Sequence, residues 1–525
     1  MIDRILTVGG YTLLSRITGF LRDVVMAAVL GAGPVADAFL VAFRLPNHFR
    51  AIFAEGAFSA AFVPAYARIR AQGGPDPARL FAERIFTLLL VTQLLLLALA
   101  AAFTPGVIRL LAPGFESDPG RFALAVTLTR VTFPYLLAMT LVSLYGGMLN
   151  ALDRFAAAAA APILLNLSMM ATLALAAFFP SAGHAAAWGV LIAGVLEVGL
   201  LAGATARLGE LPRLRRIAWD ADVKRFFTAL GPAIIGSGGV QLALFADTII
   251  ASFLPAGAIS ALYYADRLNQ LPIGVIGIAV GTVLLPEMSR RIAQGDEDGA
   301  RNAQSRAIEF TLLLSLPCLV AFLIIPDLIL RALFARGAFT AADAAAAAAT
   351  LSAYAIGLVP FVLIRSMVAM FFARGDTATP VKAALTAVPV NIAFKVLLMG
   401  PLAQVGLALA TTIGAWINFA LVLWFGVRRG YLRRDRELAR ALVKLAAAGA
   451  ALALVLWLGQ RPALDLFAAS GRWRDLLALA LLAAVGAAVY GGVVLALFGR
   501  QWLARLRRRR AAARRSLSEP QVPVD

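Results

Sequence analysis

The chain has 525 residues, of which 61% are hydrophobic and only 15% are charged, against roughly 25% charged residues in an ordinary soluble protein. So little polar surface cannot cover a water-soluble globule of this size, which excludes a cytosolic enzyme, a secreted domain and a disordered scaffold. The net charge of +19 would suggest nucleic acid in a soluble protein, so the position of the basic residues relative to the apolar segments is decisive. One cysteine, Cys318, and two histidines argue against disulfides and against cysteine- or histidine-ligated metal centres.

Long uncharged segments recur along the chain, and residues 85–104, 396–427 and 476–499 contain no Asp, Glu, Lys or Arg. A membrane-spanning helix needs about 20 apolar residues, and segment 396–427 is long enough for a strongly tilted or extended helix. The sequence predicts an all-α polytopic membrane protein with about 14 transmembrane helices. Their centres lie near residues 20, 45, 92, 135, 168, 195, 238, 275, 317, 358, 388, 415, 452 and 487.

The basic residues predict the orientation of these helices. If each span takes the chain to the opposite side of the membrane, about 33 Lys and Arg lie on the side of the N-terminus and about 7 on the other side. Cytoplasmic loops of membrane proteins collect Lys and Arg, so both termini are predicted to be cytoplasmic. The C-terminal segment RLRRRRAAARR is then an anchor near anionic lipid rather than a nucleic-acid site.

A weak internal repeat indicates two related halves. AFRLPN from Ala42 pairs with YADRLNQLP from Tyr264, and FPYLLAMTLVSLYGG pairs with VPFVLIRSMVAMFFARG, both at an offset of six spans. Coincidence among apolar segments is the alternative. The repeat predicts two pseudo-symmetric six-helix lobes, 1–222 and 223–435, followed by two additional transmembrane helices within 436–500 and a basic tail, 501–525. Transporters built from such repeats bind substrate between the halves.

Many charged residues lie inside the predicted spans, although a charge at the bilayer centre costs about 2.5–3.5 kcal/mol. They must therefore form pairs, lie near the interface or line a wet cavity. The basic ones are Arg16, Arg22, Arg44, Arg50, Arg130, Arg267, Arg365 and Lys395, and the acidic ones are Asp23, Asp37, Glu55, Asp247, Asp266 and Glu309.

The second span carries a polar stripe. At about 100° per residue, Asp37, Arg44, His48 and Glu55 lie near one line over about 27 Å of helix. Pro46 lies midway and could kink the helix. We interpret the stripe as the lining of a cavity; structural ion pairs, such as Asp37 with Arg44, are the alternative. Since arginine binds phosphate oxygens in bidentate fashion, an anionic, phosphorylated ligand is favoured over a cationic drug.

The same residues carry a resemblance to a known family. Residues 14–66, LSRITGFLRDVVMAAVLGAGPVADAFLVAFRLPNHFRAIFAEGAFSAAFVPAY, and YYADRLNQLPIGVIGIAVGTVLLPEMSR, residues 263–290, resemble the MurJ (MviN) family of bacterial lipid II flippases. This family belongs to the multidrug/oligosaccharidyl-lipid/polysaccharide (MOP) exporter superfamily. The resemblance implies two six-helix lobes around a central cationic cavity, with two C-terminal helices that form a groove for the lipid tail.

The resemblance also implies site residues. Arg16, Arg22, Arg50 and Arg267, from the segments SR, FLRD, NxxR and YYADR, would meet the diphosphate and headgroup of lipid II. The residues implied for the cavity or gate are Asp37, Arg44, Asn47, Glu55 and Asp266. Asp247 and Asp376 occupy places that fit a sodium site found in some members, with a polar packing contact and a helix cap as the alternatives.

The function expected from these features is translocation of lipid II from the cytoplasmic to the periplasmic leaflet of the bacterial inner membrane by alternating access. The alternatives are another MOP-type exporter, either a polysaccharide-lipid flippase or a multidrug antiporter, and a membrane-embedded enzyme. The sequence contains no GxxxxGK[ST] phosphate loop, so we expect no ATP hydrolysis and no cofactor, with sodium or proton coupling left open. The expected partners are lipid II, membrane lipids and, by family, proteins of wall synthesis and division, with no nucleic acid.

Overall fold

The computed structural model describes residues 2–53, 57–432 and 435–499, apart from the side chains of residues 2–6, 48–53, 235–243 and 278–279. Two compact units make up the chain and are described separately. Unit 1 comprises Met1–Tyr264, Phe334–Ala346 and Val396–Leu407, and unit 2 comprises Ala265–Leu333, Ala347–Lys395 and Ala408–Asp525. The lobe boundaries expected from the sequence stay a prediction.

Helices form almost all of the described chain, because a backbone that crosses lipid must satisfy its hydrogen bonds internally. The helices up to residue 252 are α1 (Ile2–Leu30), α2 (Pro34–Phe53), α3 (Ala57–Gly73), α4 (Pro75–Ala102), α5 (Thr104–Leu111), η1 (Pro113–Ser117), α6 (Pro119–Thr132), α7 (Pro134–Ala151), α8 (Ala156–Ala174), η2 (Ala176–Phe178), α9 (Ala182–Arg207) and α10 (Ala221–Ser252).

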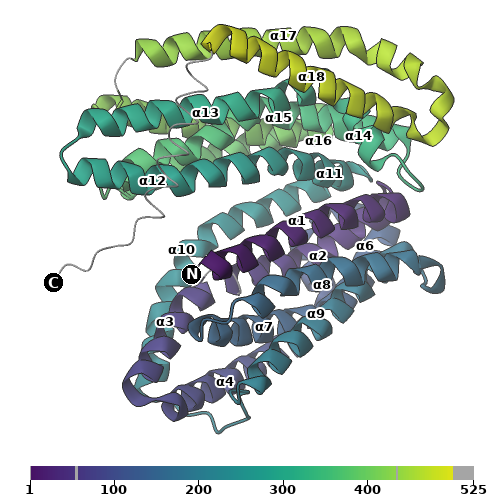
Figure 1. Ribbon diagram of the computed structural model, residues 1–525. Coiled ribbons are helices and arrows are strands. Elements are labelled where there is room, and N and C mark those ends of the chain that lie inside the picture. Colours follow the sequence, from purple (N-terminus) through teal and green to yellow (C-terminus); the bar gives the residue numbers. More distant parts are fainter. Residues whose placement is uncertain (1, 54–56, 433–434, 500–525) are drawn as a thin grey trace. The chain divides into compact units, whose positions relative to one another are not determined.

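The remaining helices begin with α11, which crosses the division between the units. They are α11 (Ala258–Pro272), the π-helical turn η3 (Ile273–Gly277), α12 (Ile278–Ala293), α13 (Glu297–Ile324), α14 (Pro326–Phe334), α15 (Ala341–Phe372), α16 (Ala378–Arg428), α17 (Arg436–Leu466), η4 (Ala468–Trp473) and α18 (Arg474–Phe498) (Figure 1).

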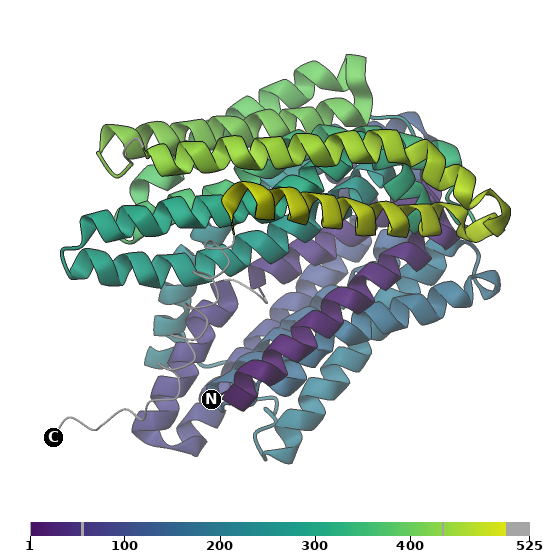
Figure 2. The same cartoon turned by 45° about the horizontal axis from the view of Figure 1, so that its top comes forward.

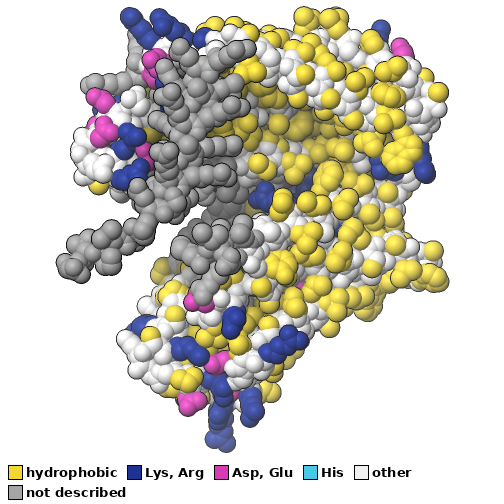
Figure 3. Space-filling model, viewed as in Figure 1, with side chains coloured by type: hydrophobic (Ala, Val, Ile, Leu, Met, Phe, Trp, Pro, Cys, Tyr) yellow, Lys and Arg dark blue, Asp and Glu magenta, His cyan; other side chains and the backbone are white. Residues whose placement is uncertain are grey.

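These helices confirm an all-α membrane architecture. Ten stretches of the described residues are long and apolar enough to cross a membrane, with α6–α7, α11–α12 and the whole of α16 each counted once. Every predicted span centre lies within a described helix. Broad areas of the visible face are hydrophobic (Figure 3).

The two predicted span centres near 388 and 415 agree with the structure, whereas a single tilted or extended helix over 396–427 does not. Ala403 has φ 45° and ψ −126°, so α16 is two helices joined at a break. Gly400 and Pro401 come just before it, and proline removes a backbone donor and clashes with the preceding turn. The apolar segment therefore covers the end of one helix and most of the next.

Unit 1 has an aromatic core where α3, α4 and α10 meet. Phe58, Phe62 and Tyr66 are spaced four residues apart on α3 and stack in turn, with ring centroids 5.1 and 5.8 Å apart. Phe81 of α4 stacks on Phe62 at 5.6 Å, and Phe226 of α10 meets the same rings edge-on. The helical spacing of aromatic residues thus builds a rigid base at this end of the unit.

Within unit 2, α17 and α18 form a hairpin whose helices run side by side (Figures 1 and 2). Gly486 of α18 lies where an added Cβ would come within 2.9 Å of Leu452, and Gly449 of α17 lies equally close to Leu316 of α13. The hydroxyl of Tyr490 donates to the carbonyl of Leu313 at 2.9 Å. Small residues therefore allow close helix packing, as is common within lipid.

Short helices follow two of the long helices in a similar way, while the six-span repeat itself stays a prediction. A long apolar helix, α4, is followed by α5 with Arg109 in its last turn, and α13 is followed in the same way by α14 with Arg331. The segment after α14 packs on the end of α1, where the amide of Ala338 donates to the carbonyl of Ala28 at 2.7 Å. Gly337 has φ +58°, and an added Cβ would lie 2.3 Å from that carbonyl oxygen, so this contact requires glycine.

Candidate functional site

Arg22 lies in a buried polar cluster on α1. Its guanidinium bonds Asp23 Oδ1 through Nε at 3.1 Å and through Nη2 at 2.7 Å, and it donates to Asn166 Oδ1 of α8 at 3.2 Å. The Tyr263 hydroxyl donates to Asp23 at 2.9 Å. Arg22 and Asp23 are only 6% and 3% exposed, so in this conformation Arg22 is engaged by protein groups and serves to hold α1 against α8.

Asp37 of α2 is completely buried and caps α11. Its carboxylate accepts the amides of Gly257 at 2.7 Å and Ser260 at 2.9 Å, and the Ser260 hydroxyl at 2.6 Å. Arg121 of α6 lies 3.6 Å away, is 5% exposed, and stacks its guanidinium 4.1 Å above the Phe115 ring. The hydrogen bonds, the helix N-terminus and the Arg121 guanidinium therefore offset part of the cost of burying this carboxylate away from water.

The alternative of a structural ion pair holds for Asp37, but its partner is Arg121 and not Arg44. Arg44 is half-buried and donates to Thr248 Oγ1 of α10 at 2.8 Å, whereas Arg121 supplies the counter-charge of Asp37. The polar stripe thus divides between different neighbours. Asn47 is half-buried. The side chains of His48, Arg50 and Glu55 lie outside the described residues.

Arg16 differs from these residues because its side chain is exposed. It lies near the middle of α1, and its neighbours Leu13, Ile17 and Leu21 are 62%, 50% and 49% exposed. It forms no ion pair with any residue that the structure describes. The sequence predicts α1 as the first span, and a guanidinium in a span requires water or an anion, because exposure to lipid alone would be costly.

Unit 2 holds the other predicted residues. Arg267 and Asp266 are half-buried on α11, and Asp266 accepts a hydrogen bond from the Gln270 amide. Arg365 was identified within a span but not as a site residue. It is exposed on α15 and crosses the π turn at Gly277, where an added Cβ would lie 2.8 Å from its Cδ. A mid-span arginine against a glycine is the signal that could have identified it.

The two residues suggested for sodium occupy different units. Asp247 is half-buried in α10, and Asp376 precedes α16. Asp376 accepts the Thr379 amide at 3.1 Å and pairs with Arg429, as the helix-cap alternative requires. Over the part of the chain that the structure describes, no group of three or more His, Cys, Asp or Glu side chains could hold a metal ion. The sodium site therefore gains no support.

We predict that Asp376 contributes to stability rather than to ion coupling. Burial alone would raise its pKa, but the hydrogen bonds from Thr379 and the guanidinium of Arg429 hold the pKa of Asp376 below its usual value. A carboxylate with a lowered folded-state pKa stabilises the protein above about pH 4 and loses that contribution as the pH falls further. Asp376→Asn should flatten the loss of unfolding free energy on acidification. An unchanged acid limb in thermal unfolding would contradict this.

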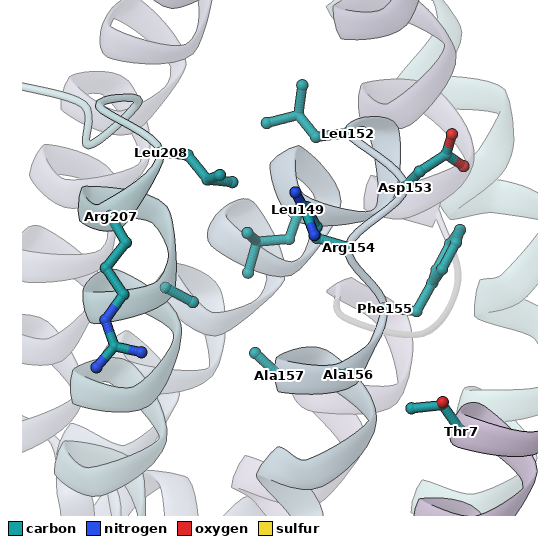
Figure 4. A pocket seen from close by; sticks show the side chains of 11 residues that line it. Thr7, Leu149, Leu152, Asp153, Arg154, Phe155, Ala156, Ala157, Arg207 and Leu208 are labelled. Carbon is teal, nitrogen blue, oxygen red and sulfur yellow. The ribbon is translucent and has the colours of Figure 1, made fainter. Parts of the chain in front are cut away.

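A cavity of about 830 Å³ lies elsewhere in unit 1, where α7 and α9 end and α8 begins. Arg154 extends from the loop after α7 towards α9, Arg207 lies on the opposite wall, and the Asp153 carboxylate points to the far side of the loop (Figure 4). Asp153 has φ 61°, and the amide of Arg154 closes the helix end on the carbonyl of Leu149 at 2.8 Å. None of the predicted site residues lines this cavity.

Comparison with known proteins assigns the class and the family. The fold resembles a solved structure described as lipid II flippase MurJ in an inward closed conformation, with a TM-score of 0.78 and 23% identity over 94% of this chain and 99% of that chain. It also resembles an inward-facing multidrug resistance MATE transporter of the MOP superfamily, with a TM-score of 0.63 and 14% identity over 81% and 97%. These likenesses define the class of the fold, an all-α polytopic membrane protein.

The sequence comparisons are more specific. Residues 26–469 match the family described as "Lipid II flippase MurJ". A probable lipid II flippase MurJ of Rhizobium meliloti is 42% identical over 87% of this chain and 86% of its own length, and the lipid II flippase MurJ of Burkholderia cenocepacia is 35% identical over 86% and 89%. The chain belongs to the MurJ family of lipid II flippases.

Proposed function

We propose that this protein moves lipid II from the cytoplasmic to the periplasmic leaflet of the bacterial inner membrane. Relatives named lipid II flippase MurJ match most of the chain. One structural observation supports binding of an anionic headgroup. Arg16 presents an exposed guanidinium in the middle of α1, the first predicted span, where only water or an anionic ligand would compensate its charge. A diphosphate headgroup supplies that anion, since arginine binds phosphate oxygens through paired hydrogen bonds.

In this proposal, Arg16, Arg22, Arg50 and Arg267 receive the diphosphate and the adjoining headgroup. Arg22 becomes available only when its bonds to Asp23 and Asn166 open. Asp37, Arg44, Asn47, Glu55 and Asp266 shape the cavity or its gate. For Asp37 this role is supported by its four buried contacts to α11 and Arg121, which must break before α2 and α11 separate.

The undecaprenyl tail stays in lipid or in the groove of α17 and α18, and alternating access releases the headgroup outward. Both termini face the cytoplasm, as the excess of Lys and Arg on that side predicts. Membrane potential would supply about 2.3 kcal/mol per charge per 100 mV. Surrounding lipids, together with proteins of wall synthesis and division, are the expected partners.

Headgroup selectivity tests this function against another MOP-type exporter. The purified protein in lipid nanodiscs is expected to bind lipid II and to be displaced by excess lipid II, but not by a cationic drug or by an undecaprenyl-diphosphate carrying an unrelated sugar. Translocation of fluorescent lipid II in proteoliposomes is the companion measurement. Equal binding of the unrelated polysaccharide lipid would favour the polysaccharide-lipid exporter instead.

A further inference from the structure

Residues 209–220, between α9 and α10, form an irregular segment that we call the strap. Polar groups of α3 and α4 hold both of its ends. Near the start, Glu210 is 4% exposed and pairs with Arg70 at 2.6 Å, while Arg79 donates to the Gly209 carbonyl. At the far end, Asp220 pairs with Arg84 and caps α10 by accepting the Val223 amide at 2.8 Å.

The Glu210 contact includes a neutral phenol. Burial and the nearby Glu210 carboxylate raise the pKa of Tyr66 to about 12, so its hydroxyl keeps its proton and lies within 3.4 Å of that carboxylate as a donor. Tyr66 belongs to the aromatic stack of α3, which gives the start of the strap a rigid base.

The middle of the strap is bound to the third and fourth turns of α4. The amide of Arg215 donates to Thr87 Oγ1 at 3.0 Å, its Nε pairs with Glu83 at 2.8 Å, and the amide of Arg213 lies 3.4 Å from the same carboxylate. Thr87 stands just inside the uncharged segment 85–104, about 3 Å past its start at 1.5 Å per residue. The strap therefore lies at the level where α4 enters the apolar layer.

The opposite side of the strap is apolar and exposed. The exposed fractions are 67% for Leu214, 53% for Ile217 and 53% for Trp219. Such a group of exposed apolar side chains on one segment indicates a surface that binds something. The side chains of Arg213 and Arg216 are exposed among them and form no ion pair with any described residue. Charged side chains gather at this end of unit 1, where α3 and α4 meet (Figure 3).

We propose that the strap is an interfacial membrane anchor that inserts Leu214, Ile217 and Trp219 at the headgroup boundary and binds acidic phospholipid through Arg213 and Arg216. Tryptophan and alternating apolar and basic residues are typical of the headgroup boundary. The guanidinium groups of Arg213 and Arg216, which form no ion pair with a described residue, complement lipid phosphates. The occupant is the phospholipid surface itself. Its assignment to the cytoplasmic leaflet rests on the orientation given under the proposed function.

Site-directed fluorescence tests the location. Because Cys318 is the sole cysteine, a Cys318→Ser background accepts Leu214→Cys or Ile217→Cys for a polarity-sensitive label, with Gln72→Cys, exposed near the α3–α4 turn, as the matched control. In phosphatidylcholine–phosphatidylglycerol vesicles, a spin label on the upper acyl chain should quench positions 214 and 217 several-fold more than 72, and aqueous iodide several-fold less. Iodide quenching equal to that at position 72 overturns the proposal.

A second experiment tests whether the strap binds acidic lipid. Removal of phosphatidylglycerol, or the change Arg213→Gln with Arg216→Gln, should reduce the lipid quenching at position 214 to the same lower level. Quenching that does not depend on phosphatidylglycerol overturns the acidic-lipid contact. Both readouts report position rather than transport, so their failure is distinguishable from a failure to move lipid II.

Discussion

Arg16→Ala should lower lipid II translocation by about 10- to 100-fold at matched protein level, because a charge-assisted hydrogen-bonding group contributes about 1.5–3 kcal/mol. The side chain is exposed on α1 and pairs with no described residue, so its removal takes nothing from the folded protein. Thermal unfolding should therefore stay unchanged while translocation in proteoliposomes falls.

Two controls sharpen this experiment. Arg16→Lys keeps the charge but loses the bidentate geometry, and translocation should fall between the wild type and the alanine variant. Arg109→Ala removes an arginine that is equally exposed but pairs with the exposed Glu116 at the end of α5, and should leave translocation unchanged. Normal translocation by Arg16→Ala would remove Arg16 from the substrate site.

Asp37→Asn should destabilise the protein by about 3–5 kcal/mol, the usual cost of breaking a buried ion pair from one side. Asparagine could still accept a hydrogen bond from the start of α11, but the buried Arg121 would keep only the more exposed Asp118, 3.8 Å away, as a counter-charge. The expected result is a marked fall in the midpoint of thermal unfolding of the purified protein, together with reduced translocation.

A double-mutant cycle separates the pair from the cap. Arg121→Met alone should destabilise the protein, and adding it to Asp37→Asn should cost much less than the sum of the two single changes. Asp118→Asn is the matched control: it also caps a helix and faces Arg121, at 3.8 Å, but is 44% exposed, so only about 1 kcal/mol is expected. Additive effects at Asp37 and Arg121 would show that the pair is not coupled.

Sequence patterns predicted the helices well because lipid imposes length and hydrophobicity on every span. They could not predict the environment of individual charges. Arg16 and Arg22 lie six residues apart on one helix, yet one is exposed and the other is sealed against Asn166 of α8. The partner of Asp37 is Arg121 of α6, which is not among the charged residues that the sequence places inside spans. Such partners depend on which helices pack together, and periodicity along one helix carries no information about this.

The π-helical turn Ile273–Gly277 joins α11 to α12 and sets how the faces of the two helices are rotated relative to each other. A π turn accommodates one residue more than an α-helical turn does. If this surplus residue were absorbed into regular helix, every side chain beyond it would rotate by about 100° relative to those before it. Asp266 and Arg267 precede the turn and Glu287 follows it, so one local change of winding would reorient the charged faces of α11 and α12 against each other without bending either helix.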